Sequence, residues 1–148
     1  MSTYTQIIYQ IVFCTKNREK TLRKNARETL FKYISGIIKS KQSHLYQING
    51  VEDHIHIVTH IHPSVSVANF VKDIKVASSR MIKEENLFPN FVGWQSGYAA
   101  FTYSIEAKEN LIEYVKNQEE HHSRMTSIDE LIHFLKHHNI DFDPKFLI

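Results

Sequence analysis

The sequence of 148 residues lacks several features that define common protein classes. Its one cysteine, Cys14, cannot form an internal disulfide, so a cytoplasmic location is expected. No run of eighteen apolar residues is present, which argues against a membrane-spanning helix or a membrane partner. Residues 1–10 alternate polar and apolar side chains, so no signal peptide is expected there. The four glycines form no glycine-rich phosphate loop, which argues against a nucleotide cofactor.

The composition that is present, 42% apolar and 23% charged residues, is typical of a globular protein. We therefore expect one domain, residues 1–148, long enough to bury a core. The charge is uneven: residues 16–41 hold nine basic and two acidic side chains, whereas residues 106–148 hold five and nine. Such a basic segment can bind phosphates, although a charge run is also typical of a solvated helix face.

Hydrophobic periodicity predicts an α+β fold. We expect strands at residues 4–15, 44–48, 51–61 and 98–104, and helices that begin near Asn25, at Ser64 or Ser66, near Ala107 and near Ser127. The order β-α-β-β-α-β predicts a ferredoxin-like (RRM-like) antiparallel sheet with helices on one face, followed by C-terminal helices. The third strand would lie centrally in that sheet.

Three local signals refine this prediction. Asn25 with Glu28, and Ser127 with Glu130, have the spacing of helix capping boxes. Asn49-Gly50 is a hairpin turn signal between the second and third strands. Residues 107–120 are expected to form one continuous helix.

His54 and His56 are the strongest candidates for a functional site. Because side chains alternate along a strand, both imidazoles would project from one face of the third strand. Histidine is the commonest protein metal ligand, so this pair predicts a metal site. The alternative is a half-exposed strand whose polar residues face solvent. His121 and His122 are adjacent on a helix, where their rings diverge by about 100°, and so suit one metal poorly.

Tyr114 and Gln118 are four residues apart and would share one helical face. A tyrosine nucleophile beside an oxygen-bearing metal ligand is what metal-assisted phosphodiester cleavage through a covalent intermediate requires. The alternative is that Tyr114 only covers the edge of the core, with its hydroxyl in water.

These two motifs resemble those of the HUH-superfamily single-tyrosine transposases of small bacterial insertion sequences, including their REP-associated relatives. Residues 49–57 resemble the family's histidine–hydrophobe–histidine motif, and residues 114–118 resemble its tyrosine motif. Residues 94–98 and 66–80 also resemble family segments, and the resemblance runs from about Tyr4 to the C-terminus.

The resemblance implies a bacterial DNA transposase that cleaves and rejoins single-stranded DNA through a 5′-phosphotyrosine on Tyr114. It implies a divalent metal held by His54, His56 and Gln118, for which Mg²⁺ or Mn²⁺ suits imidazole and amide-oxygen ligands better than structural zinc. It also implies DNA with hairpins near the element ends and a homodimer, with Tyr114 acting on its own or its partner's histidines. A domesticated relative would keep the same residues.

Phosphate contacts are predicted for two groups of basic side chains, and base stacking is predicted for two aromatic side chains. The basic residues are Lys16, Arg18, Lys20, Arg23, Lys24, Lys72, Lys75, Arg80 and Lys83, and the aromatic residues are Trp94 and Tyr98. Trp94 equally suits the core.

Two other functional classes stay open. A non-catalytic ferredoxin-like nucleic-acid binder would need the basic surface but none of His54, His56 and Tyr114. RNA-binding versions usually carry aromatic side chains on the central strands, where this chain has histidines. A metal-dependent phosphoesterase that uses water would need the histidines while Tyr114 is structural.

Overall fold

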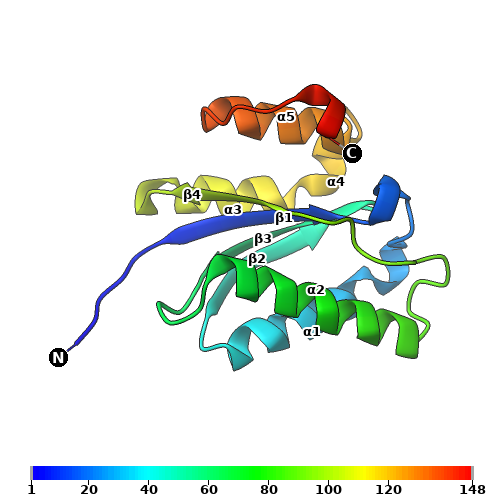
Figure 1. Ribbon diagram of the computed structural model, residues 1–148, viewed down its shortest axis with the longest axis horizontal. Helices are drawn as coiled ribbons and strands as arrows, with labels where there is room; N and C mark the ends of the chain where they lie inside the picture. The colour runs from blue at the N-terminus through cyan, green and yellow to red at the C-terminus, as the bar shows by residue number, and fades with distance from the viewer. Residues whose placement is uncertain (1, 148) are drawn as a thin grey trace.

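The computed structural model describes residues 2–147, and its centre is a four-stranded antiparallel sheet (Figure 1). The strands are β1 (Ile8–Cys14), β2 (His44–Gly50), β3 (His54–His60) and β4 (Ala99–Tyr103), in the order β2-β3-β1-β4. The α-helices are α1 (Lys24–Ser40), α2 (Val67–Glu84), α3 (Lys108–Lys116), α4 (Gln118–His122) and α5 (Ser127–His137). The predicted β-α-β-β-α-β order and the central place of β3 are confirmed.

The sheet separates two layers of helices (Figure 1). Helices α1 and α2 cover one face, and the C-terminal helices α3, α4 and α5 cover the other. Ile55 and Ile57 of β3 point into the core beneath α1 and α2, whereas Val58 packs with Leu111 and Val115 of α3. Burying a side chain such as Ile57 contributes about 1.5–3 kcal/mol, so a shift by one residue would be costly. This register directs His54 and His56 toward the C-terminal helices.

Two helix starts differ from the local signals. Helix α1 begins after Arg23 with no side-chain cap, so the predicted Asn25–Glu28 capping box is wrong. Helix α2 begins after Ser66, whose hydroxyl accepts a hydrogen bond from the Asn69 amide, which decides between Ser64 and Ser66.

The connection between β2 and β3 is also not the predicted Asn49-Gly50 turn. Asn49 and Gly50 are still paired with β3, and the chain reverses over residues 51–53, where the Val51 amide donates to the His54 carbonyl. Asn49 instead donates through its side chain to the carbonyls of Val115 and Lys116 at the end of α3.

Gly50 lies against the backbone that leads into His54. A Cβ atom at Gly50 would lie 2.5 Å from the His54 carbonyl oxygen, so no larger residue fits without a shift of backbone. The buried Arg27 donates to the Gly50 carbonyl at 3.0 Å and holds the same turn from α1. Gly50 is therefore required by close packing beside the first candidate ligand.

The predicted helix over residues 107–120 is two helices. Helix α3 ends at Lys116, and Gln118 begins the short helix α4 after a break at Asn117. The break occurs where the Asn49 side chain donates hydrogen bonds to two of the last carbonyls of α3. Among residues 2–147, no helix is long and apolar enough to cross a membrane.

The last capping box is shifted by one residue from the prediction. Thr126 and Asp129 cap α5, not Ser127 and Glu130. Both pairs have suitable spacing, but the side chains of Ser127 and Glu130 have partners on the sheet and on α3 and α4.

Candidate active site

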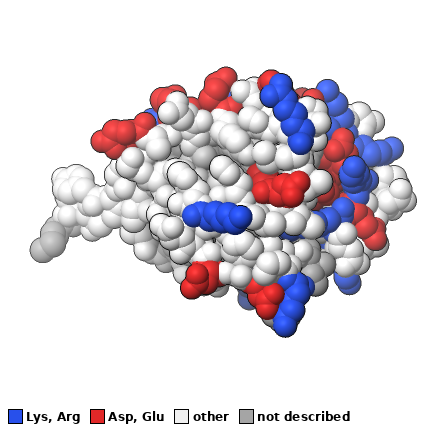
Figure 2. All heavy atoms as spheres, turned by 90° about the horizontal axis from the view of Figure 1, so that it is seen from above, with Lys and Arg blue, Asp and Glu red and all other residues white. Residues whose placement is uncertain are grey.

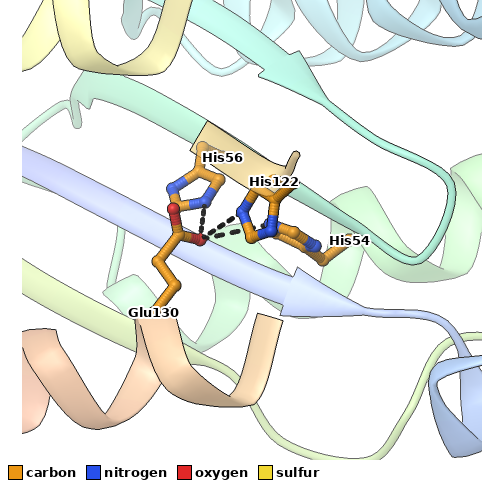
Figure 3. A group of neighbouring side chains, drawn as sticks. All are labelled: His54, His56, His122 and Glu130. Atoms are coloured by element: carbon orange, nitrogen blue, oxygen red, sulfur yellow. Dashed lines mark hydrogen bonds and ion pairs between the residues drawn. The ribbon is translucent and has the colours of Figure 1, made fainter. Parts of the chain in front are cut away.

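His54 and His56 lie beneath the C-terminal helices rather than at a solvent-facing surface. Their exposed fractions are 1% and 0%, so the half-exposed strand that sequence patterns left open is wrong. Helices α4 and α5 close over this part of β3 (Figure 3). Buried polar side chains lose their hydrogen bonds to water, so they require hydrogen-bond or ion-pair partners within the protein.

Those partners converge on one carboxylate from α5. Oxygen Oε1 of Glu130 lies 2.7 Å from Nε2 of His56, 3.1 Å from Nε2 of His122 and 3.2 Å from Nε2 of His54 (Figure 3). Glu130 is itself 1% exposed. Three imidazoles, two from β3 and one from α4, thus direct their Nε2 atoms at the same carboxylate oxygen.

The other ring nitrogen of two histidines is held by an acceptor. Nδ1 of His54 lies 2.7 Å from Asp53 Oδ1, and Nδ1 of His122 lies 3.0 Å from the Met125 carbonyl oxygen. Each acceptor favours the tautomer that carries its proton on Nδ1 and leaves a lone pair on Nε2. Ser127 donates to the second oxygen of Asp53 and fixes that carboxylate to α5.

Burial and pairing shift the protonation of this cluster. Burial disfavours the charged form of His54, but hydrogen bonds to Asp53 and Glu130 outweigh it and raise the pKa of His54 to about 9. Burial lowers the pKa of His56 despite its contact with Glu130. Burial opposes the Glu130 carboxylate, yet the three histidines hold its pKa far below the usual range. Without a metal ion, Glu130 is therefore the counter-charge of a cationic His54.

Tyr114 and Gln118 reach the same carboxylate, although they come from separate helices. The Tyr114 hydroxyl donates to Glu130 Oε2, and the Gln118 amide donates to that oxygen at 3.2 Å. The Gln118 carbonyl oxygen lies 3.3 Å from Nε2 of His54. Burial and the adjacent Glu130 carboxylate both raise the pKa of Tyr114 well above its ordinary value. The phenol is consequently protonated in this closed arrangement.

Sequence patterns alone did not identify two members of this cluster. Helical spacing predicts that His121 and His122 diverge and suit one metal poorly; in the structure only His122 faces β3, while the His121 ring stacks on Tyr114. The spacing Tyr114–Gln118–His122 is a four-residue repeat that could have placed His122 with the other two. Glu130 was assigned to helix capping instead.

The donor set fits a divalent metal ion. One ligand atom from each of His54, His56, His122 and Glu130 lies within 4.8 Å of the others. Ligands that bind zinc at 2.0–2.1 Å in a tetrahedron stand roughly 3.4 Å apart, so small side-chain movements would accommodate an ion. Neutral imidazoles and a carboxylate are ordinary ligands for such ions.

An open cleft of about 490 Å³ adjoins this cluster. It lies between β4, α5 and the C-terminal segment, and Tyr98, Phe101 and Phe134 contribute to its mostly apolar wall. His54 and Glu130 are among its lining residues, so the cleft reaches the cluster.

The predicted phosphate-contacting residues differ in their contacts: some are paired with other groups, and some are exposed. Lys24 pairs with Glu119, Arg18 donates to Ser127, and Lys75 donates to the carbonyls of Gln95 and Gly97. The others are exposed: Lys16, Lys20, Arg23, Lys72, Arg80 and Lys83. Figure 2 shows basic side chains gathered toward the end of the molecule away from the N-terminus, interleaved with acidic ones. Their contact with DNA stays a prediction.

The two aromatic candidates differ in exposure. Trp94 packs edge-on against Phe13 and Phe91 and donates to Ser78, as its core interpretation predicts. Tyr98 is 44% exposed and lines the cleft. Of the pair, Tyr98 is therefore the one with a ring available for base stacking.

Comparison with known proteins identifies the family of this chain. The model of the family described as "Transposase IS200 like" matches residues 3–118, which include both histidines, Tyr114 and Gln118. The chain belongs to the IS200-like transposase family. The family assigns it to the DNA transposases, as its motifs predict.

Relatives agree with this assignment. The chain is 23% identical to the ISDra2 transposase TnpA of Deinococcus radiodurans over 120 residues, which cover 76% of this chain and 84% of that protein. A crystal structure from Deinococcus radiodurans R1, described as that of a transposase, superimposes with a TM-score of 0.61 at 23% identity, covering 80% and 95% of the two chains. A REP-associated tyrosine transposase bound to a REP hairpin gives 0.62 at 13% identity, covering 84% and 76%. At these identities, the two solved structures show only that they share their fold with this transposase.

Proposed function

We propose that this transposase cleaves and rejoins single-stranded DNA, with Tyr114 as the nucleophile. A divalent metal at His54, His56 and Gln118, Mg²⁺ or Mn²⁺ by the family resemblance, would assist the reaction. The observation that supports the proposal best is that Tyr114, Gln118 and both histidines meet at Glu130. A tyrosine that merely covered the core would have no reason to lie at a cluster of metal-ligating groups.

The reaction proposed is a transesterification. The Tyr114 oxygen attacks the scissile phosphorus, the bond from phosphorus to the 3′ oxygen breaks, and the proton lost by the tyrosine balances the one gained by the new 3′-hydroxyl. A metal ion held by the histidines would polarise the phosphate as a Lewis acid. A second 3′-hydroxyl reverses the step and joins new ends, so the phosphodiester bond energy is kept and no nucleotide cofactor is required.

Tyr114 requires help to lose its proton. Its hydroxyl donates to Glu130, and the neighbouring carboxylate disfavours the phenolate. A phosphate also cannot contact the imidazoles while they are buried beneath α4 and α5. We therefore expect DNA entry along the cleft to separate Glu130 from Tyr114 before attack.

Membership of the family supports a proposal for the partners. We propose single-stranded DNA with hairpins near the element ends as the substrate; one structural relative is described as bound to a REP hairpin. The proposed homodimer is not required to bring the tyrosine to the histidines, because Tyr114 and His56 of one chain already contact the same Glu130.

The test uses labelled single strands from both flanks of the gene, incubated with protein and Mg²⁺ or Mn²⁺ and separated on a denaturing gel. Tyr114→Phe and His56→Ala are expected to lose a protein–DNA adduct that the wild type forms. Tyr33→Phe, an exposed tyrosine on α1, is the matched control and should retain it.

The same gel separates the alternatives. Cleavage without an adduct that persists in Tyr114→Phe would identify a phosphoesterase that uses water. Binding without cleavage or adduct, also when the strands are extended to whole flanking hairpins, would favour the non-catalytic binder and refute the proposal.

A further inference from the structure

We propose that α4 and α5 complete a four-ligand metal site, in which His122 and Glu130 join His54 and His56. This set would prefer a transition-metal ion such as Zn²⁺ or Co²⁺ over Mg²⁺. The inference rests on the proposed function in one respect, that His54 and His56 bind the metal. It adds two ligands that lie after residue 118, the last residue of the family match.

The first argument is the state of His122. Its Nε2 is buried and lies 3.1 Å from Glu130 Oε1, a contact that does not have hydrogen-bond geometry. A buried polar atom without a well-aligned hydrogen bond destabilises the folded protein. A metal ion between this nitrogen and the carboxylate would give both atoms a partner.

The second argument is the support behind each ligand. Metal-binding histidines usually donate their other ring nitrogen to a carboxylate or a backbone carbonyl, which fixes the ring and the tautomer. His54 has this arrangement through Asp53, and His122 has it through the Met125 carbonyl. Asp53 is in turn held by Ser127, so α5 orients one ligand and supplies another.

His56 has a partner that can serve both states of the site. Its Nδ1 lies 3.1 Å from the amide nitrogen of Gln10, which is fully buried, and the Gln10 oxygen accepts from the Tyr103 hydroxyl. In this arrangement the Gln10 amide donates to Nδ1 of His56. The His56 proton is then on Nε2 and is donated to Glu130. Metal binding through Nε2 requires the other tautomer.

A half-turn of the Gln10 amide provides that tautomer without loss of hydrogen bonds. The Gln10 oxygen would then accept from Nδ1 of His56, and its NH₂ group would donate to the Tyr103 hydroxyl. That hydroxyl can redirect its own proton to Nε2 of His138, 3.2 Å away. Gln10 is thus a positioning residue for a metal-bound His56.

The third argument is the ligand chemistry. Three imidazole nitrogens and one carboxylate oxygen resemble the ligand sets of zinc sites, whereas Mg²⁺ prefers six oxygens and gives up its water reluctantly. Divalent zinc and cobalt also bind nitrogen ligands more strongly than manganese does. Gln118 adds a neutral amide oxygen at the edge of this set, 3.3 Å from Nε2 of His54.

Such a site would have a mechanical consequence. The four ligands come from β3, α4 and α5, so a bound ion would tie the C-terminal helices to the sheet. With Oε1 of Glu130 on the ion, Oε2 would still accept from Tyr114 and Gln118. The carboxylate would then hold the tyrosine next to the metal.

The experiment measures metal binding rather than activity. Untagged, metal-free protein is titrated with Co²⁺, followed by the visible absorption that four-coordinate cobalt shows strongly and six-coordinate cobalt weakly, and Zn²⁺ affinity is obtained by competition with a chelator. The variants are His56→Ala, Gln118→Ala, His122→Ala and Glu130→Gln, and His133→Ala on the exposed face of α5 is the control. Circular dichroism reports whether each variant is folded.

We expect wild type and His133→Ala to give the four-coordinate spectrum. His122→Ala and Glu130→Gln should weaken Zn²⁺ binding by at least about 100-fold, more than the effect of a typical supporting residue. Gln10→Leu, which removes the amide without removing a ligand, should weaken it by roughly 10–100-fold. Gln118→Ala, which removes the neutral amide oxygen of the proposed function, should weaken Zn²⁺ binding less than His122→Ala or Glu130→Gln does.

Two results would overturn the inference, and they are distinguishable. If Gln118→Ala and His56→Ala lose metal while His122→Ala, folded, keeps it, the three-ligand site of the proposed function stands and the four-ligand site is wrong. If the wild type binds no ion, or His56→Ala binds as well as wild type, the metal in the proposed function fails as well.

Discussion

Oε1 of Glu130 lies 2.7 Å from Nε2 of His56, although the two residues are 74 positions apart in the sequence. The contact joins the C-terminal helix α5 to the central strand of the sheet. Because the other oxygen of Glu130 accepts from Tyr114, the same carboxylate connects the predicted nucleophile with the predicted metal ligands. The position of α5 therefore controls both halves of the site.

This connection within one chain predicts that Tyr114 serves the histidines of its own protomer. Mixing Tyr114→Phe with His56→Ala protein should then give no protein–DNA adduct, because neither chain has a complete site. The measurement is the denaturing gel with labelled single strands, after co-refolding to mix any dimers. Adduct formation by the mixture would contradict this and show that a partner's tyrosine is used.

Replacing Gly50 should disturb the turn that precedes His54. Gly50→Ala places a Cβ 2.5 Å from the His54 carbonyl oxygen, so we expect a loss of about 1–3 kcal/mol in the free energy of unfolding, measured with urea. Gly36→Ala in α1 is the matched control, since nothing lies within 4 Å of its Cβ. It should stabilise the helix by roughly 0.5–1 kcal/mol. Equal effects of the two substitutions would refute the close-packing role of Gly50.

The shifted histidines predict a stability maximum for the metal-free protein. His54 has its pKa raised from an ordinary value near 6.5 to about 9, so its contribution is complete below pH 6.5 and is lost as the pH rises through 9. The pKa of His56 is lowered, so stability falls as the pH drops below 6.5 and the unfolded chain takes up that proton. Asp53 and Glu130, with lowered pKa values, act in the same direction on the acidic side.

Urea unfolding in the presence of a chelator should therefore show greatest stability near pH 6.5. The loss between pH 6.5 and 9 should be on the order of 3 kcal/mol, since each unit of pKa shift is worth 1.36 kcal/mol. His54→Gln should flatten this alkaline decline, whereas His133→Ala should not. A wild-type profile that is level from pH 6.5 to 9 would contradict the assigned charge of His54.

The exposed basic residues on α2 predict a salt-dependent contribution to DNA binding. Arg80→Ala combined with Lys83→Ala should weaken single-strand binding regardless of sequence and reduce the salt slope by roughly 1.4, about 0.7 for each lost phosphate contact. Lys32→Ala with Lys39→Ala removes the same charge from α1 and should have a smaller effect. Fluorescence anisotropy at several salt concentrations provides both values, and identical slopes for the two double variants would reject a specific role for α2.

Local sequence patterns are enough to predict the order of helices and strands and the pair of motifs. Alternation along β3 places Ile55 and Ile57 on one face and His54 and His56 on the other, and this follows from local backbone geometry. The tyrosine motif is likewise recognisable because Tyr114 and Gln118 are four residues apart, even though the helix breaks between them.

The residues that complete the site are selected by long-range packing. Thr126 with Asp129 and Ser127 with Glu130 both have capping-box spacing, so local sequence cannot choose between them. The choice depends on distant partners: Ser127 bonds Asp53, and Glu130 contacts the buried His54 and His56. Those partners meet only after α5 packs on β4 through Phe134 and Phe101, a long-range contact that no local pattern encodes.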